Sequence, residues 1–322
     1  MSFTHRSSQR FKDLLKALSV IAEEVEFTVN PEGLTAAQMD RDHRAMFVLK
    51  MPSTAFERWD VIEEQKFTVD VDNLVKRFLK NTCKEESVEF SIDPERARLN
   101  VTLRGKTVRQ KEVPILQPTD EEVPQPKVFF KTKARIIIGS LRKAISDTSL
   151  VSENVRIAVE GEALKISATG DMGSVHNEWE KGSDDLIEIR GEDDSSATFT
   201  TSYLEKIMKA IQPLSEAATL ELSTDMPMKI FPELDQGCVL DFYLAPDTPP
   251  PVGTEEEAYE EQVAGVVQPG ELDTAPAEAP TPVPIEVPVI MPVKVPEPLP
   301  TPPTVPVPSI MLDMRVLKWI KL

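Results

Sequence analysis

The first 246 residues contain the same features twice in the same order, and this limits the chain to folds built from two similar units. The segment VEFTVNPEGLTAAQMD is similar to VRIAVEGEALKISATGD, which begins 130 residues later. Each is typical of a β-hairpin: two runs of alternating polarity around a turn with glycine and acidic residues. The pair NLVKRFLK and YLEKIMKA follows at the same offset, and SID and STD follow 132 residues apart. Chance similarity of short hairpins is the alternative, but the shared order favours a duplication.

Each copy also begins with a helical pattern, FKDLLKALSVIAEE in the first and IIIGSLRKAISDTS in the second. Each copy then reads as helix, hairpin, further strands, second helix and more strands. We therefore predict an α+β fold of two topologically similar domains, each with two helices packed on antiparallel β-sheets. The domains are placed at 1–112 and 129–246. Residues 113–128, with four prolines and three acidic residues, are predicted to be an interdomain connector.

Composition changes sharply near residue 246. Of the 28 prolines, 17 lie in the last 76 residues, which also carry 12 acidic residues against 4 basic ones. Proline at this density removes backbone donors and fixes φ, so we expect 247–322 to be an acidic, Pro-rich and disordered tail. Its last 13 residues, IMLDMRVLKWIKL, are mostly apolar.

Positive charge is concentrated on the predicted helices of an otherwise acidic protein. The sequence has 54 Asp and Glu against 36 Lys and Arg, a formal charge of -18, which alone argues against nucleic-acid binding. A solvated outer face would explain the cations of any single helix. Because all four helices carry cations at equivalent places in the repeat, we expect a local surface that attracts a polyanion without sequence readout. The cations are Arg10, Lys12, Lys16, Lys76, Arg77, Lys80, Lys84, Arg142, Lys143, Lys206 and Lys209.

No pattern of catalytic residues is present. Asp40, Asp42 and His43 lie within four residues of one another, but at a strand end they would point to different faces, and no second His or Cys cluster accompanies them. The motifs GxxxxGK[ST], GxGxxG and GxSxG are missing. We therefore predict a protein that is not an enzyme, with no catalytic residues, no metal and no cofactor.

The cysteines and the apolar runs bear on location. Cys83 and Cys238 lie far apart and in no ligand spacing, which indicates a reduced, intracellular protein. The first residues lack the apolar region of a signal peptide, and no apolar run reaches the roughly 18 residues that a membrane span needs.

Several motifs, taken in order, resemble the DNA sliding clamps of the proliferating cell nuclear antigen (PCNA) family, most of all the archaeal members. They are QMDRDH followed by AMFVLKMP, then SLVSENVRI, ISATGDMG, SYLEKIMKA, STDMPMKI and DFYLAP. The resemblance spans residues 1–246 and implies the DNA clamp fold. It further implies that three subunits join head to tail into a homotrimer ring around duplex DNA, with the helices lining the hole and the sheets forming the outer wall.

The resemblance implies a DNA polymerase sliding clamp, a processivity factor for DNA replication and DNA repair. Such a scaffold tethers polymerase, ligase and nuclease to the template through short docking peptides, and a separate clamp loader places it on DNA. We expect it in the cytoplasm of an archaeal-type cell, associated with the nucleoid.

The resemblance also implies two kinds of protein contact. A partner-docking groove would be formed by Met39, Asp40, His43, Met46, Val123, Pro124, Pro227, Tyr243, Leu244, Ala245 and Pro246. The subunit interface would pair two edge strands of opposite charge, carrying Lys106, Arg109, Lys111, Glu178 and Glu180.

Three features depart from the family pattern. The segment FTHRSS is polar for a first strand and is expected to be short or frayed. Pro232 is expected to end its strand early. The long tail either presents 310–322 as a tethered peptide that docks on a partner or a clamp groove, or has no role.

Two alternatives to the homotrimer stay open from the sequence. The first is a subunit of a heterotrimeric clamp. The second is a DNA-independent interaction adaptor in which the Pro-rich tail is the main functional element.

Overall fold

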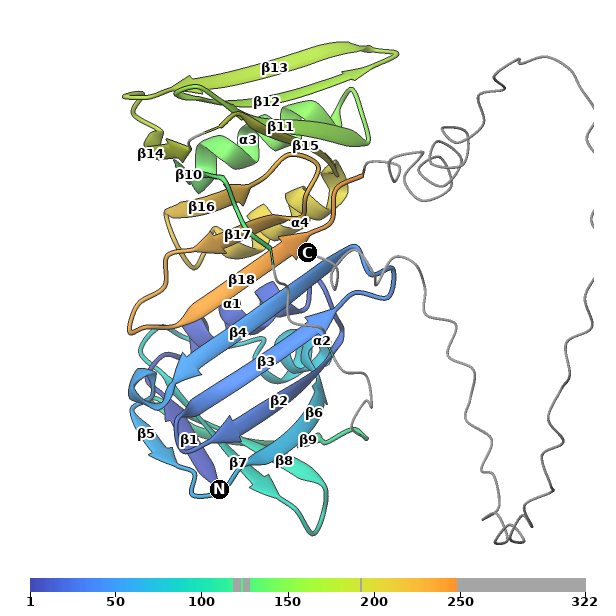
Figure 1. Cartoon of the computed structure of the whole chain (residues 1–322). Coiled ribbons are helices and arrows are strands. Elements are labelled where there is room, and N and C mark those ends of the chain that lie inside the picture. The colour runs from blue at the N-terminus through green and yellow to red at the C-terminus, as the bar shows by residue number, and fades with distance from the viewer. Residues whose placement is uncertain (118–122, 124–127, 192, 248–322) are drawn as a thin grey trace, which may run out of the picture. The chain divides into compact units, whose positions relative to one another are not determined.

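The computed structural model describes residues 1–117, 123, 128–191 and 193–247 (Figure 1). The first half of this chain runs through the elements β1 (Ser2–His5), α1 (Ser8–Leu18), β2 (Glu24–Asn30), β3 (Gly33–Met39), β4 (Ala45–Pro52), η1 (Ser53–Ala55), β5 (Arg58–Asp60), β6 (Gln65–Asp70), α2 (Val71–Asn73), η2 (Leu74–Phe78), β7 (Ser87–Asp93), β8 (Arg98–Arg104) and β9 (Val108–Pro114). Here η1 is a 3-10 turn and η2 is a π-helical turn that continues α2.

The second half repeats this order. Its elements are β10 (Thr132–Ile137), α3 (Ile138–Ser149), β11 (Asn154–Glu160), β12 (Ala163–Gly170), β13 (Gly173–Glu180), β14 (Leu186–Gly191), β15 (Ser195–Thr200), α4 (Thr201–Ile211), β16 (Ala217–Leu222), β17 (Met228–Pro232) and β18 (Val239–Leu244). Apart from η1 and η2, every element of one half has its counterpart in the other. The predicted fold, two similar units with two helices each on antiparallel sheets, is therefore confirmed.

The strands form three antiparallel sheets. One of nine strands has the order β14-β10-β16-β17-β18-β4-β3-β2-β6, one of five has the order β5-β1-β7-β8-β9, and one of four has the order β13-β12-β11-β15. The nine-stranded sheet crosses from one half to the other because β18 pairs with β4, from Val239 opposite Lys50 to Leu244 opposite Ala45. The backbone hydrogen bonds between β4 and β18 are thus the main non-covalent contact between the halves.

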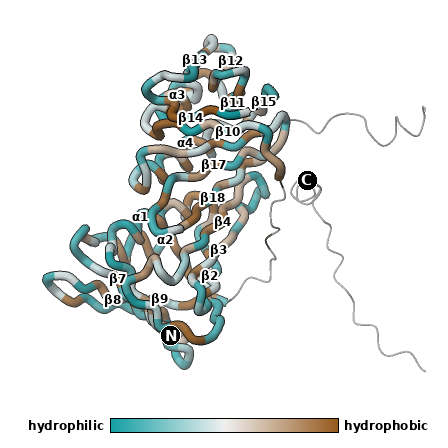
Figure 2. Tube along the Cα trace, turned by 60° about the vertical axis from the view of Figure 1, so that its left-hand side comes forward, coloured by the Kyte–Doolittle hydropathy of each residue, from teal (hydrophilic) through white to brown (hydrophobic). Residues whose placement is uncertain are grey.

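The four helical segments pack in a row, in the order α2, α1, α4, α3. In Figure 2, α1 and α2 lie on one side of strands β18, β4, β3 and β2. Amphipathic spacing explains this packing: α1 buries Phe11, Leu14, Leu15 and Leu18, which recur three and four residues apart. The N-terminus of α1 is capped by Ser7, whose hydroxyl accepts a hydrogen bond from the Arg10 amide at 3.3 Å.

Period-two alternation explains why each sheet has one buried face. On β4 the side chains of Phe47 and Leu49 lie in the main core, as do those of Phe242 and Leu244 on β18. Their neighbours along each strand therefore point to the opposite face. Within the described residues, no helix is long and apolar enough to cross a lipid bilayer.

The first strand and the strand that contains Pro232 were both expected to be short. The first strand is short, at four residues, but it is not frayed: β1 pairs with both β5 and β7, and Phe3 is buried among Phe56, Trp59 and Phe90. The central phenylalanine anchors the strand although the residues around it are polar. The expectation for Pro232 is confirmed, because β17 ends at this residue.

Gly170 provides a test of the second hairpin. A Cβ at Gly170 would lie 1.9 Å from the carbonyl oxygen of Val151, whereas a Cβ at Gly139, in α3, would meet nothing within 4 Å. We expect Gly170→Ala to lower the free energy of unfolding by about 1–3 kcal/mol, because backbone must move to admit the methyl group. Gly139→Ala, the control, should leave it unchanged or raise it by up to about 1 kcal/mol. Urea denaturation of the two variants measures both; equal stabilities would contradict the packing described.

Candidate functional site

The cations predicted for the helices lie mostly on their exposed faces. The exposed members are Arg10 and Lys16 on α1, Lys76 and Arg77 on η2, Arg142 and Lys143 on α3, and Lys206 and Lys209 on α4. Each helical segment carries more Lys and Arg than Asp and Glu. Since the four segments pack in one row, we group these eight exposed cations as the basic strip. This strip suits diffuse attraction of a polyanion, because its cations are spread over four helical segments.

Some of these cations are held by neighbours. Arg10 pairs with Asp235 at 2.6 Å, and Lys76 pairs with Asp72 at 2.8 Å, which raises the pKa of the Lys76 amine through their hydrogen bond. The Arg142 guanidinium donates to Gln212 at 2.6 Å. In the described part of the chain, Lys16, Lys143 and Lys209 form no ion pair. These three exposed cations, one on each of α1, α3 and α4, provide a test of the strip.

The second predicted helix is shorter than the sequence suggested. Helical structure ends at Phe78, where the Leu79 amide donates to the Leu74 carbonyl five residues back, at 2.9 Å. Lys80 and Lys84 therefore do not continue the helix: both are exposed in the loop 79–86. Lys12 is only half exposed, and its amine donates to the Lys80 carbonyl at 3.1 Å. The prediction that Lys80 and Lys84 belong to the second helix was wrong, because the wide π turn ends the helix before them.

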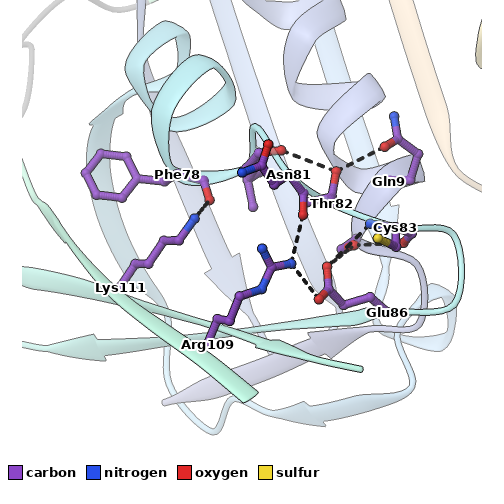
Figure 3. A network of polar contacts seen from close by, with 10 residues as sticks. Gln9, Phe78, Asn81, Thr82, Cys83, Glu86, Arg109 and Lys111 are labelled. Atoms are coloured by element: carbon purple, nitrogen blue, oxygen red, sulfur yellow. Dashed lines mark hydrogen bonds and ion pairs between the residues drawn. The ribbon is translucent and has the colours of Figure 1, made fainter. Parts of the chain in front are cut away.

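Arg109 and Lys111 hold this loop from the neighbouring strand β9 (Figure 3). The Arg109 guanidinium donates to Glu86 Oε1 at 2.6 Å and to the Asn81 carbonyl at 2.8 Å. The Lys111 amine donates to the carbonyl of Phe78 at the end of η2. Burial, followed by the nearby charge of Arg109, lowers the pKa of the Lys111 amine. Positive groups at carbonyls left open by a helix end are favourable there.

This network corrects the role predicted for Arg109 and Lys111. They were expected to offer positive charge across a subunit boundary, but both side chains turn toward the loop of their own domain. The pattern of strand and charge could not reveal this, because Glu86 and the helix end come near β9 only in the folded chain. Lys106, in the turn before β9, is exposed as expected.

Glu86 is the buried centre of the network. Besides Arg109 it accepts from the Ser8 hydroxyl at 3.3 Å and from the Cys83 amide at 3.4 Å, and only 5% of the residue is exposed. We expect Glu86→Ala to destabilise the chain by about 1–3 kcal/mol, because it leaves these donors without their acceptor. The neighbouring exposed Glu85→Ala should change stability by less than about 0.5 kcal/mol. Urea denaturation compares them, and an equal effect of both substitutions would refute the central position of Glu86.

A small apolar cluster lies on the face of the nine-stranded sheet opposite the main core. Met39, Met46 and Tyr243 are direct cross-strand neighbours on β3, β4 and β18. Met46, Tyr243 and Ala245 are buried, and partly buried Met39, Val48, Val123 and Phe130 pack around them. We call these seven residues the docking pocket. Methionine and tyrosine side chains give such a pocket an adaptable apolar surface.

Five of the predicted docking residues thus come together: Met39, Met46, Val123, Tyr243 and Ala245. Val48 and Phe130 were not among the predicted residues. Val48 could have been found as the residue two positions after Met46 on the same strand face. Phe130 is the second of two phenylalanines after the connector, and the sequence does not distinguish it from the exposed Phe129. Pro227 and Pro246 are buried next to β17 and β18, and Pro124 lies outside the described residues.

Leu244 does not belong to the docking pocket. It is buried in the main core with Phe242, on the other face of β18 from Tyr243. The prediction treated the run from Tyr243 to Pro246 as one surface, whereas alternate residues of a strand point to opposite faces. Leu244 therefore supports the pocket from behind through packing of the core.

Asp40 organises the turn that carries Met39 and His43. Its carboxylate accepts from the amides of Arg44 and Ala45 at 2.7 and 2.8 Å and from the Tyr203 hydroxyl of α4 at 2.5 Å. Burial, followed by the hydrogen bond to Asp40, raises the pKa of the Tyr203 hydroxyl. His43 has a left-handed backbone, φ 52°, and its amide donates to the Asp40 carbonyl at 3.0 Å. The Asp40–His43 cluster thus closes a β-turn, and both carboxylate oxygens of Asp40 accept hydrogen bonds from within the chain.

Of the six edge strands of the three sheets in the described chain, two are the counterparts of strands that pair across the boundary between the halves. They are β9, at the edge of the five-stranded sheet, and β13, at the edge of the four-stranded sheet. Their counterparts in the repeat are β18 and β4, which pair with each other. Glu178 and Glu180 are exposed on β13, although Glu178 lies 3.6 Å from Lys165. The backbone of β9 and the backbone of β13 are therefore available for the pairing that β18 and β4 already make.

Comparisons with known proteins agree with this geometry. Two protein families match: the one described as "Proliferating cell nuclear antigen, N-terminal domain" over residues 4–115, and the one described as "Proliferating cell nuclear antigen, C-terminal domain" over residues 130–247. A DNA polymerase sliding clamp of Thermofilum pendens is 29% identical over 246 residues, which cover 76% of this chain and 98% of the relative.

Two solved structures share the fold. The PCNA2-PCNA3 complex from Sulfolobus tokodaii matches with a TM-score of 0.70 and 24% identity, over 77% of this chain and 99% of the other. The structure of A. fulgidus PCNA with the C-terminal region of FEN-1 bound matches with a TM-score of 0.68 and 23% identity, over 77% and 99%.

Proposed function

The chain belongs to the proliferating cell nuclear antigen family and is a DNA polymerase sliding clamp, and we propose that it works by encircling duplex DNA. The observation that carries this proposal is the basic strip made by the exposed faces of α2–η2, α1, α4 and α3, in a protein whose formal charge is -18. A strongly acidic protein with cations gathered on one side favours DNA on that side alone.

In this proposal the protein is retained on DNA because the ring encloses the duplex. The cations of the strip are proposed to contact phosphates alone, so the contact is weak, salt-dependent and equal at all sequences. A closed ring then prevents dissociation while the DNA remains free to slide through. The protein needs no chemistry of its own for this, and we propose that it is not an enzyme but a scaffold for enzymes that act on DNA.

Repetition of the fold supports closure into a ring. Inside one chain, the last strand of the second unit pairs with the fourth strand of the first, β18 with β4. The same two positions in the other units, β9 and β13, are open edges. Pairing β9 of one subunit with β13 of the next would repeat the internal contact and gives a head-to-tail interface. Three copies of the two-domain chain in a ring is the assembly that we propose.

A heterotrimer remains the second candidate. The Sulfolobus tokodaii structure holds two different clamp subunits in one complex, and this chain is similar to it in fold. Open edges of the same kind would serve equally well for pairing with a related chain. Size-exclusion chromatography of this protein alone separates the two: a trimer supports the homotrimer, and a monomer supports a mixed ring.

The docking pocket is proposed to receive short peptides of polymerase, ligase, nuclease and clamp loader. Support comes from its apolar lining and its place beside the connector residue Val123. In a solved structure of the same fold, the C-terminal region of FEN-1 is bound to A. fulgidus PCNA. Peptides with aliphatic and aromatic anchors suit a pocket of this kind. A cytoplasmic location, on the nucleoid of an archaeal-type cell, is part of the same proposal.

Charge reversal tests the basic strip. We expect Lys16→Glu, Lys143→Glu and Lys209→Glu together to shorten the residence of the loaded protein on nicked circular DNA at 150 mM salt by about 10-fold or more, because three phosphate-facing cations become repulsive. The control reverses three exposed cations of the strands and turns, Lys50, Lys66 and Arg96. It should leave the residence unchanged. Gel filtration of the loaded complexes measures both, and similar losses in the two variants would locate DNA elsewhere.

Substitution of the open edge tests the ring contact. Val108 is 59% exposed on β9, and Gln110 is exposed on the same strand. Val108→Asp with Gln110→Asp should convert a trimer into monomers in sedimentation velocity, because carboxylates then face the acidic strand β13. Ile62→Asp, at an exposed position between β5 and β6, should stay trimeric. A trimer that survives the β9 substitutions shows that another surface closes the ring.

A further inference from the structure

The docking pocket lies where the described chain ends. Tyr243 and Ala245 belong to the pocket, and Pro246 and Asp247 follow directly. Asp247 is fixed in place by an ion pair with Arg44 and by its amide, which donates to the Thr198 carbonyl at 2.7 Å. The described chain therefore ends within a few residues of the pocket, at an anchored position.

The outer margin of the docking pocket is apolar and only partly buried: Met39, Val48, Val123 and Phe130 surround the buried Met46, Tyr243 and Ala245. Alternation along β4 and β18 places Met46, Val48 and Tyr243 on the face opposite the helices, and only Val123 and Phe130 approach from outside the sheet. Burial of further apolar surface is the main source of affinity for any segment that binds there. A suitable occupant carries several aliphatic residues and an aromatic residue within a short stretch.

Residues 310–322 of this chain have that composition. The stretch IMLDMRVLKWIKL contains eight aliphatic or methionine residues and Trp319 among thirteen residues, with Asp313 its single acid. By contrast, residues 248–308 are rich in proline and contain no tryptophan or phenylalanine. The apolar stretch is thus a distinct segment behind a spacer of different chemistry.

The spacer is long enough for a return to the pocket. A flexible chain of the 61 residues from 248 to 308 has an r.m.s. end-to-end distance of about 45 Å, and extended polyproline would reach farther. Tethering of this kind gives effective concentrations in the millimolar range. Even a segment with an intrinsic Kd of about 10 μM would then occupy its pocket about 99% of the time.

We propose that residues 310–322 occupy the docking pocket of their own chain and compete there with the peptides of partner proteins. The inference rests on the proposed function of the pocket, and it adds that the tethered segment regulates the access of partner peptides. A partner peptide must displace the tethered segment, so only partners with high affinity, or those that also hold another surface, gain access. Removal of the segment makes the pocket open to weak ligands.

A labelled peptide of residues 309–322 tests the proposal against three full-length proteins. The first is the unchanged chain, and the second carries Leu317→Ala with Trp319→Ala, which removes the main anchors of the tethered copy. The third adds Val48→Glu in the pocket to these two changes. We expect the peptide to bind the second protein at least 10-fold more tightly than the first, because its site is no longer occupied, and to lose that binding in the third.

Val239→Glu, added to the same two tail changes, is the matched control for Val48→Glu. Val239 lies on β18 opposite Lys50, outside the pocket residues, and is 40% exposed. It should leave the peptide's affinity as in the second protein. If Val48→Glu fails to fold, Met39→Glu at the partly exposed margin of the pocket replaces it.

Three results would overturn the proposal: no measurable binding to the second protein, equal affinity for the first and second, or binding that persists in the third. Retention on nicked circular DNA tests the proposed clamp function separately from the occupant of the pocket. The Leu317→Ala, Trp319→Ala protein should be retained on nicked circular DNA like the unchanged chain, since neither residue belongs to the basic strip. Poor retention of both proteins would contradict the clamp itself and not the occupant of the pocket.

Discussion

The backbone ladder between β4 and β18 is the interaction on which the rest of the molecule depends. It joins the two halves into one nine-stranded sheet, and it aligns α1 with α4 so that four helices form a single row. The same ladder brings Met46 beside Tyr243 and so builds the pocket across the boundary between the halves. It also leaves the equivalent strands β9 and β13 at open edges, which is the condition for repeating the contact between molecules. One pairing rule thus accounts for the basic strip, the docking pocket and the proposed ring.

Much of the fold could be predicted because duplication is visible in the sequence. Two hairpins and two helices at a constant offset specified the order of elements, and amphipathic spacing specified which faces of α1 and α4 are buried. The end of the second helix could not be read in this way. The π turn at Leu74–Phe78 and its support by Lys111 depend on a strand that lies more than thirty residues farther along the chain. A local pattern cannot report an interaction of that kind.

The sequence predicted which residues lie near one another better than it predicted what each side chain contacts. Five residues named from the resemblance lie together in the docking pocket, but Leu244 faces the core, and the Asp40 carboxylate accepts hydrogen bonds from two amides and the Tyr203 hydroxyl. Arg109 and Lys111 looked like free charges on an edge strand and instead stabilise the loop around Glu86. In each case the sequence gives the residue's chemistry, whereas only the fold decides which face of a strand or which nearby carbonyl uses it. Strand alternation alone would have excluded Leu244 from the predicted docking residues, because it points to the opposite face from Tyr243.

The central claim is that this protein stays on DNA because it surrounds it and not because it binds tightly. The most direct measurement loads the full-length protein onto nicked circular DNA, purifies the complex, and follows retention before and after a single restriction cut at physiological salt. The account predicts retention on the circle that lasts many times longer than on the cut molecule, with rapid loss from the free ends. Equal lifetimes on circular and linear DNA would contradict it, because contact at the basic strip would then be sufficient without enclosure.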